Sequence, residues 1–173
     1  VGAFIAGSAT SEVRYEQTSG TVEVIGGGGG TLTFDDNGGG TDFVISTSVG
    51  VETLNLVSGT MTLKSGRSLG LIGSKADFPV DKHLIAGTLI LESGNGVNPT
   101  QVFFGNYQQL EISGTLRTVH PEPPGFTTNR FVQFCPDADV EAYSIHARQG
   151  SLLDLSFVRF DNLLSGRSVP EQT

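Results

Sequence analysis

The sequence has a single cysteine, few charged side chains and no long hydrophobic run, and each shortage excludes a class of protein. Tryptophan is absent as well. One cysteine, Cys135, cannot form an internal disulfide framework, so the fold must hold without one. We expect Cys135 to be a small buried hydrophobic residue rather than a nucleophile. Only 16% of the 173 residues are charged, and Ala, Lys and Glu are too sparse for a helical bundle. No long hydrophobic run is present either: the opening apolar stretch, VGAFIAGSA, is far too short to span a bilayer.

Positive charge is also scarce, whereas glycine is abundant. Ten Lys and Arg residues are outnumbered by 18 Asp and Glu residues, which gives a formal net charge of −8. Because an acidic surface repels phosphate backbones, nucleic acid is not an expected partner. The 24 glycines interrupt every helical window and favour short strands joined by tight turns. We therefore expect one all-β domain over residues 1–173.

Three segments of the chain are nearly the same. LVSGTMTLKSG (residues 56–66), LIAGTLILESG (84–94) and LEISGTLRTV (110–119) each alternate apolar and polar residues around a Gly-Thr pair. The pairs begin at Gly59, Gly87 and Gly114, with separations of 28 and 27 residues. A repeat in this range indicates the stacked coils of a solenoid, and a period of two indicates strands with one buried face. Equivalent positions of successive coils are therefore predicted to lie over one another in parallel strands.

The repeats divide the domain into regions. Residues 51–119 are the repeated coils, 120–129 a Pro-rich loop and 130–173 the C-terminal strands. Residues 1–50 are Gly-rich, with strands expected at Thr21–Ile25, Thr31–Phe34 and Asp42–Ser46, and they form N-terminal strands or a cap. The alternative architecture is an antiparallel β-sandwich or jelly roll whose hairpins share Gly-Thr turns.

A further alternating segment lies near the end of the chain, in SLLDLSFVRFDNLLSG (residues 151–166). Its apolar side chains recur in strand alternation at Leu153, Leu155, Phe157 (or Val158) and Phe160. The pattern closes at Asp161-Asn162, and RFVQFCPDA (130–138) is a weaker version of it. With the three repeats, this segment resembles the coil of right-handed parallel β-helix proteins, the pectin-lyase-like superfamily. The resemblance implies a right-handed parallel β-helix of a few coils, of the kind found in adhesins and spikes.

The resemblance also implies where an enzyme of that superfamily would carry its chemistry. Such enzymes use Asp or Glu clusters, sometimes with calcium, and an Arg or Lys base on the outer face of the helix. Four charged residues stand at outward positions of the repeated strands here: Lys64, Glu92, Glu111 and Arg117. Outward charges are more often a solvent-facing surface, and a few coils offer little groove, so we assign no catalytic residue. Fold-level resemblance does not carry function.

One Gly-rich segment resembles a calcium-binding repeat. NGGGTDFVI, residues 37–45, fits the nonapeptide G-G-x-G-x-D-x-U-x except that Asn37 replaces the first Gly. Asp42 then occupies the ligand position, and Asp35 and Asp36 can contribute from the adjacent turn; carboxylate oxygens suit Ca²⁺. These three residues are the candidate metal site, and the alternative is a Gly-rich turn capped by Asp and Asn. The histidines His83, His120 and His146 show no zinc-ligand spacing. His83 ends the segment KADFPVDKH, residues 75–83, which is expected to be a loop.

Three classes of function remain. We favour a non-catalytic structural or attachment module, extracellular or in a virion, that self-assembles into an oligomer or fibre through strand edges or solenoid ends. The apolar segment Val1–Ala9 could cap one end or be donated to a neighbour. The alternative is a polysaccharide-binding or polysaccharide-cleaving β-helix module. A third reading, ice binding, would need a ladder begun by Thr60, Thr62, Thr88 and Thr115.

The Pro-rich loop is the expected contact surface. HPEPPGFTTN, residues 120–129, is the clearest insertion in the coil pattern, and loops on a regular scaffold often carry recognition. Its candidate contact residues are His120, Phe126 and Asn129. The alternative for this loop is a stiff linker between the coils and the C-terminal strands.

Overall fold

The computed structural model describes residues 12–24, 30–73, 82–95, 97–120, 131–137 and 143–161. These residues form 17 strands and contain no helix. The strands belong to three sheets, and every strand-to-strand pairing within the sheets is parallel.

The sheets are named A, B and C in the order in which the chain visits them. Sheet A contains β1 (Glu12–Glu16), β3 (Thr31–Asp35), β6 (Thr53–Leu56), β9 (Lys82–Ile85), β12 (Gln108–Ile112) and β15 (Tyr143–Ala147). Sheet B contains β2 (Gly20–Val24), β4 (Thr41–Ile45), β7 (Thr60–Leu63), β10 (Thr88–Glu92), β13 (Thr115–Val119) and β16 (Leu152–Asp154). Sheet C contains β5 (Val49–Val51), β8 (Ser68–Leu71), β11 (Thr100–Phe104), β14 (Val132–Pro136) and β17 (Val158–Phe160).

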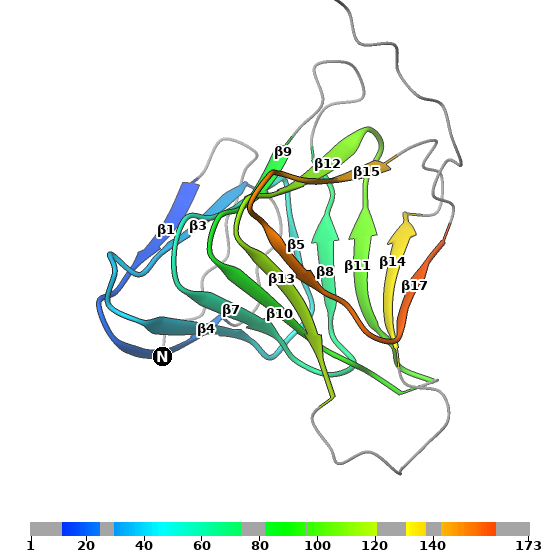
Figure 1. The fold of residues 1–173 in the computed structure, drawn as a ribbon, viewed down its shortest axis with the longest axis horizontal. Helices are drawn as coiled ribbons and strands as arrows, with labels where there is room; N and C mark the ends of the chain where they lie inside the picture. The colour runs from blue at the N-terminus through cyan, green and yellow to red at the C-terminus, as the bar shows by residue number, and fades with distance from the viewer. Residues whose placement is uncertain are drawn as a thin grey trace, which may run out of the picture.

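The chain runs through A, B and C in turn and then begins the next coil beside the last one. Figure 1 shows the result: β4, β7, β10 and β13 lie side by side, as do β5, β8, β11, β14 and β17, and the colour runs from blue at one end of the molecule to orange at the other. The structure is therefore a parallel β-helix of six coils, the first represented by β1 and β2. This confirms the predicted solenoid and excludes the antiparallel sandwich.

The three similar segments stack in register, as predicted. Thr88 of β10 pairs with Thr60 below it and Thr115 above it. The next residue in each strand points inward, so Met61, Leu89 and Leu116 form one buried column. Each coil meets the environment of its neighbour, which is why the chain repeats similar residues at these positions.

Close approach between coils explains the glycine of each Gly-Thr pair. A Cβ added to Gly87 would lie 2.5 Å from the carbonyl oxygen of Gly59, and one added to Gly114 would lie 2.1 Å from that of Gly87. The following N–H groups use the same oxygens, since the Thr88 N–H donates to Gly59 and the Thr115 N–H to Gly87, each at 2.9 Å. At this corner between sheets A and B the backbones stack with no room for a side chain.

The first fifty residues also contain stacked strands. The three strands expected there are present within one residue of their predicted ends, as β2, β3 and β4. The early coils are short: 22 residues separate the paired Thr31 and Thr53, and 18 separate Asp42 and Thr60. The last coils are longer, with 37 residues from Thr115 to its partner Leu152. Along sheets A and B, the number of residues per coil therefore rises from the early coils to the last.

The interior is a set of apolar columns reinforced by stacked aromatic rings. Phe34 lies over Tyr15 with ring centroids 5.1 Å apart, near the start of the solenoid. Near its end, Phe134 stacks on Phe160 at 5.1 Å, and Phe104 on Tyr143 at 4.4 Å. The sequence left open whether Phe157 or Val158 is the inward residue of the last repeat. Val158 packs against the core, whereas Phe157 is 69% exposed in a left-handed conformation with φ 54°.

Candidate functional site

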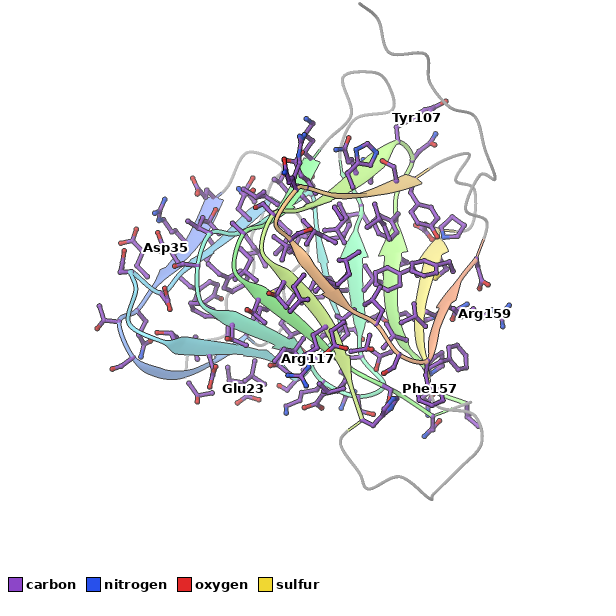
Figure 2. All side chains as sticks on the ribbon, in the orientation of Figure 1. Glu23, Asp35, Tyr107, Arg117, Phe157 and Arg159 are labelled. Atoms are coloured by element: carbon purple, nitrogen blue, oxygen red, sulfur yellow. The ribbon has the colours of Figure 1, made fainter. Side chains whose placement is uncertain are left out.

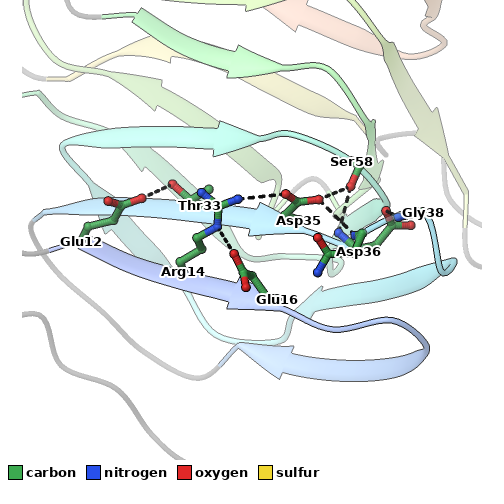
Figure 3. Close-up of polar contacts among 9 residues, drawn as sticks. Glu12, Arg14, Glu16, Thr33, Asp35, Asp36, Gly38 and Ser58 are labelled. Atoms are coloured by element: carbon green, nitrogen blue, oxygen red, sulfur yellow. Dashed lines mark hydrogen bonds and ion pairs between the residues drawn. The ribbon is translucent and has the colours of Figure 1, made fainter.

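Asp35 and Asp36, two of the three acidic residues of the predicted calcium site, lie at a corner of the second coil, where β3 ends (Figure 3). Oδ1 of Asp36 accepts the N–H of Gly38 and its Oδ2 accepts the N–H of Gly40, both at 2.9 Å. Asp35 accepts the hydroxyl of Ser58 at 2.7 Å and a guanidinium N–H of Arg14 at 3.0 Å. Both carboxylates therefore already receive donors from the protein, which is the arrangement of a capped Gly-rich turn.

These contacts also lower the pKa of both carboxyl groups. The Ser58 hydroxyl, followed by the Asn37 N–H and the Arg14 guanidinium, lowers the pKa of Asp35. The Ser58 hydroxyl and the N–H groups of the turn lower that of Asp36. Asp42, by contrast, is exposed in β4, where it pairs with Thr60. Among the residues that the structure describes, no group of three or more His, Cys, Asp and Glu side chains could hold a metal ion. The calcium site stays a prediction.

A chelator experiment tests it. We expect the melting midpoint to be the same in calcium and in EDTA, because the Asp36 carboxylate is already satisfied by backbone donors. Asp36→Ala should cost about 2 kcal/mol, since it leaves those donors unpaired at a position only 6% exposed. Asp42→Ala is the matched control and should change stability by less than about 0.5 kcal/mol. A fall in the midpoint on adding EDTA would establish the calcium site instead.

His120 lies where β13 leaves the coil. Its Nδ1 is 2.7 Å from Oγ of the buried Ser93, and its ring meets that of Phe157 edge-on at 4.8 Å. His120 therefore joins the fourth, fifth and sixth coils at one corner. The other two predicted contact residues, Phe126 and Asn129, lie outside the described residues, as does Val1–Ala9.

The four outward charges singled out by the family resemblance are engaged in ion pairs. Nζ of Lys64 is 2.6 Å from a Glu92 oxygen, and a guanidinium nitrogen of Arg148 is 2.8 Å from Glu111. Arg117, labelled in Figure 2, pairs with Asp154 at 3.1 Å. The predicted outward parity is confirmed, and each pair links one coil to the next. The Arg117–Asp154 pair is exposed on both sides and contributes little stability, whereas Glu92 and Glu111 are only 16% and 17% exposed. All three pairs neutralise charge on the outer faces.

The threonine ladder is present but narrow. Thr60, Thr88 and Thr115 stack in register on the outer face of sheet B. The next outward position, two residues further along each strand, is occupied by Thr62, Ile90 and Arg117. On sheet B, the third coil is therefore the only described one with threonines at both outward positions, which is too little for a flat Thr-x-Thr surface on that sheet.

His83 was expected in a loop, and that expectation is wrong. His83 lies within β9 with no exposed surface. Its Nδ1 accepts the N–H of Leu54 at 3.1 Å, so the ring proton lies on Nε2 and is donated to Gln108 at 2.9 Å. The inward parity that His83 shares with Ile85 is the signal that could have placed it inside. Its role is to satisfy polar groups within the core.

Cys135 was expected to be buried, but it is only half-buried. It lies on the outer face of sheet C, in register with Phe103 of β11. Burial, and after it the carboxylates of Asp161 and Asp137, raises the pKa of the thiol. A raised pKa leaves less of the thiolate, which is the nucleophilic form of cysteine, at neutral pH.

A polar hollow between the corners of the third and fourth coils was not anticipated from the sequence. Its volume is about 350 Å³, and it is lined by Ser65, Gly66, Arg67, Asn95 and Asn98. These residues come from the two loops that connect sheet B to sheet C, so only the stacking of coils brings them together.

The last coil exposes a cluster of large apolar side chains. The exposed fractions are 58% for Leu152, 44% for Leu153, 69% for Phe157 and 41% for Phe160. Leu153 and Phe160 continue the buried columns of Leu116 and Phe134. They are core positions left open because no described strand stacks beyond β15, β16 and β17. Figure 2 labels Phe157 beside this end of the molecule.

Comparison of the chain with protein-family models, with curated proteins and with solved structures finds no match. Within the described ranges, no helix has the length and apolar character needed to cross a membrane.

Proposed function

We propose that this protein is a non-catalytic structural or attachment module that associates with copies of itself through the last coil of its solenoid. The expected setting is extracellular, at a cell surface or in a virion. The observation that carries the proposal is the apolar cluster on that coil, formed by Leu152, Leu153, Phe157 and Phe160.

Two physical features of the last coil support association there. Its inward side chains are core residues that no described strand covers, and burying them releases about 25 cal/mol for each Å² of apolar surface. Its strands also stand at the ends of all three sheets, so their outer N–H and C=O groups have no partner strand among the described residues. A second subunit can satisfy the apolar and the hydrogen-bonding surfaces together.

Size-exclusion chromatography with light scattering tests the proposal. The wild-type chain should form a discrete oligomer, and Leu152→Lys should shift it to the mass of a monomer. Leu152 is outward and 58% exposed, so lysine is tolerated in the folded coil but places a charge in the interface. Val97→Lys is the matched control, because Val97 is 88% exposed in a loop of the fourth coil and should leave the mass unchanged.

A monomeric wild-type chain at all concentrations would contradict the proposal. Equal loss of association in the Leu152 and Val97 variants would also contradict it, because the effect would then come from added charge in general.

A second candidate function, polysaccharide binding, is favoured by the polar hollow. Arg67 lines it with the amide side chains of Asn95 and Asn98, and such groups donate hydrogen bonds to hydroxyl and carboxylate oxygens. This candidate predicts a monomer that binds a polysaccharide and loses affinity in Arg67→Ala. The same light-scattering run, repeated with added polysaccharide, separates the two functions.

We also propose that the chain is a distant relative of the pectin-lyase-like superfamily with a right-handed coil. Support comes from the parallel three-sheet coil and from the alternating pattern of the last repeat. Because fold does not imply function, this relationship adds nothing in favour of catalysis.

A further inference from the structure

We infer that two copies of this chain join end to end, last coil against last coil, around a two-fold axis perpendicular to the solenoid. This inference rests on the proposed self-association and adds its geometry. The alternatives are head-to-tail stacking into a filament and pairing of the two first coils. The two described ends of the solenoid differ in apolar surface, in charge and in the number of sheets that have a strand there. Each difference favours the same arrangement.

The first difference is apolar surface. All four apolar residues of the exposed cluster lie on the last coil. The corresponding side chains of the first coil, Val13, Tyr15 and Val22, are partly buried and packed against the core. Head-to-tail stacking would match the apolar end with an end whose described residues expose no large apolar side chain, whereas last-to-last pairing buries two such clusters against each other.

The second difference is charge. The described part of the first coil carries three carboxylates, Glu12, Glu16 and Glu23, against one cation, Arg14. Pairing of two first coils would therefore bring together two surfaces of net negative charge. The last coil is balanced: its formal charges are Arg148 and Arg159 against Asp154 and Asp161. Two last coils can meet without net repulsion.

The third difference is the number of sheets that have a described strand at each end. Sheets A and B begin with β1 and β2, but sheet C begins one coil later, with β5, in the described part of the chain. A first coil stacked on a last coil would therefore offer no described strand to cover β17, where Val158 and Phe160 lie. Of the two described ends, the last coil is the one that presents strands of all three sheets to cover β15, β16 and β17 together.

Side-chain contacts also hold the strands of the last coil together. The hydroxyl of Tyr143, at the start of β15, donates to the carbonyl of Asp161 just after β17 at 2.9 Å. The rings of Phe160 and Tyr143 stack on Phe134 and Phe104 of earlier coils. The first and last strands of the coil are thus tied together, so a partner meets a surface that is already ordered.

A two-fold axis has a definite consequence for strand direction. Strands of one copy run opposite to the strands they meet in the other, so the contact between subunits is antiparallel although every sheet within a subunit is parallel. Head-to-tail stacking would instead continue the parallel pairing without limit. The inference therefore predicts a closed dimer rather than a fibre that grows by stacking.

Distances between spin labels test the arrangement. Ser19 and Gln149 are both exposed and lie at the corner between sheets A and B, Ser19 on the first coil and Gln149 on the last. Each is changed singly to cysteine in a Cys135→Ser background, labelled, and measured by pulsed electron paramagnetic resonance. With strands about 4.8 Å apart, last-to-last pairing places the two Ser19→Cys labels about 50 Å apart. The Gln149→Cys labels should be much closer to each other.

Each other outcome overturns the inference in a recognisable way. A spacing of about 29 Å between like labels at both positions, which is six strand spacings, would show head-to-tail stacking and leave the proposed self-association standing. Close Ser19→Cys labels with distant Gln149→Cys labels would show pairing of the first coils. Absence of any intermolecular coupling in either variant would overturn both the geometry and the self-association.

Discussion

Gly114→Ala is expected to destabilise the protein by about 3 kcal/mol, although it adds only one methyl group. A Cβ at this position would lie 2.1 Å from the carbonyl oxygen of Gly87 and 2.2 Å from that of Ala86. Both contacts are with backbone, so no side chain can move aside. The corner has to open by about 1 Å, which strains the hydrogen bonds from the Gly114 N–H to Ile85 (3.0 Å) and from the Thr115 N–H to Gly87 (2.9 Å).

Urea denaturation of the variant beside wild type measures the effect, and Gly50→Ala is the matched control. A Cβ at Gly50 would meet only Cδ1 of Ile72, at an ordinary 3.5 Å, and β5 is extended there. We expect this control to be neutral or slightly stabilising, because alanine loses less backbone entropy than glycine on folding. Similar losses in the two variants would contradict the close stacking of coils at the Gly-Thr corner.

Leu56→Asp is expected to abolish folding. Leu56 has no exposed surface and lies in an inward column of sheet A, between Phe34 and Ile85. An aspartate there must either bury an unpaired charge or be protonated, and it also removes the packing of a leucine. The combined cost exceeds about 5 kcal/mol, which is comparable to the whole stability of many domains.

Circular dichroism and thermal melting of the purified variant measure the loss, and the neighbouring Asn55→Asp supplies the control. Asn55 follows Leu54 in β6 and points to the outer face, where the same new charge remains hydrated. We expect a cost below about 1 kcal/mol for Asn55→Asp. A folded Leu56 variant, or equal damage from both changes, would show that the two faces of β6 are assigned wrongly.

The stacking of coils could be predicted because it imposes local sequence patterns that repeat along the chain. The alternation of Leu54 and Leu56, or of Leu89 and Leu91, identifies inward faces without any knowledge of neighbours. The Gly-Thr repeat identifies the register, since each coil approaches the next at the same corner. Three short N-terminal strands, β2, β3 and β4, were predicted within one residue, because a Gly-rich connector adjoins each of them. The strands β1 and β5 were not predicted.

Features that depend on which loops meet were not predicted. His83 accepts the N–H of Leu54, 29 residues away, and contacts Gln108, 25 residues away. Its parity with Ile85 could place it on the inner face, but no local pattern shows which polar groups it would satisfy there. The polar hollow around Arg67 exists only because two loops of unlike sequence stack. The exposed apolar end was not predicted for a different reason. Leu153 and Phe160 alternate as core residues do, and only the number of coils in the structure shows that no described strand lies beyond them.

Cross-linking of paired cysteines tests the parallel stacking most directly. In a Cys135→Ser background, one variant carries Thr88→Cys with Thr115→Cys and a second carries Ile90→Cys with Arg117→Cys, two pairs that face each other in register on the outer face of sheet B. Two further variants exchange the partners, joining 88 with 117 and 90 with 115. Parallel strands about 4.8 Å apart predict rapid intramolecular cross-linking in the first two variants and little in the exchanged pair. Cross-linking of the exchanged pair in preference to the in-register pair would mean antiparallel strands, and would contradict the solenoid.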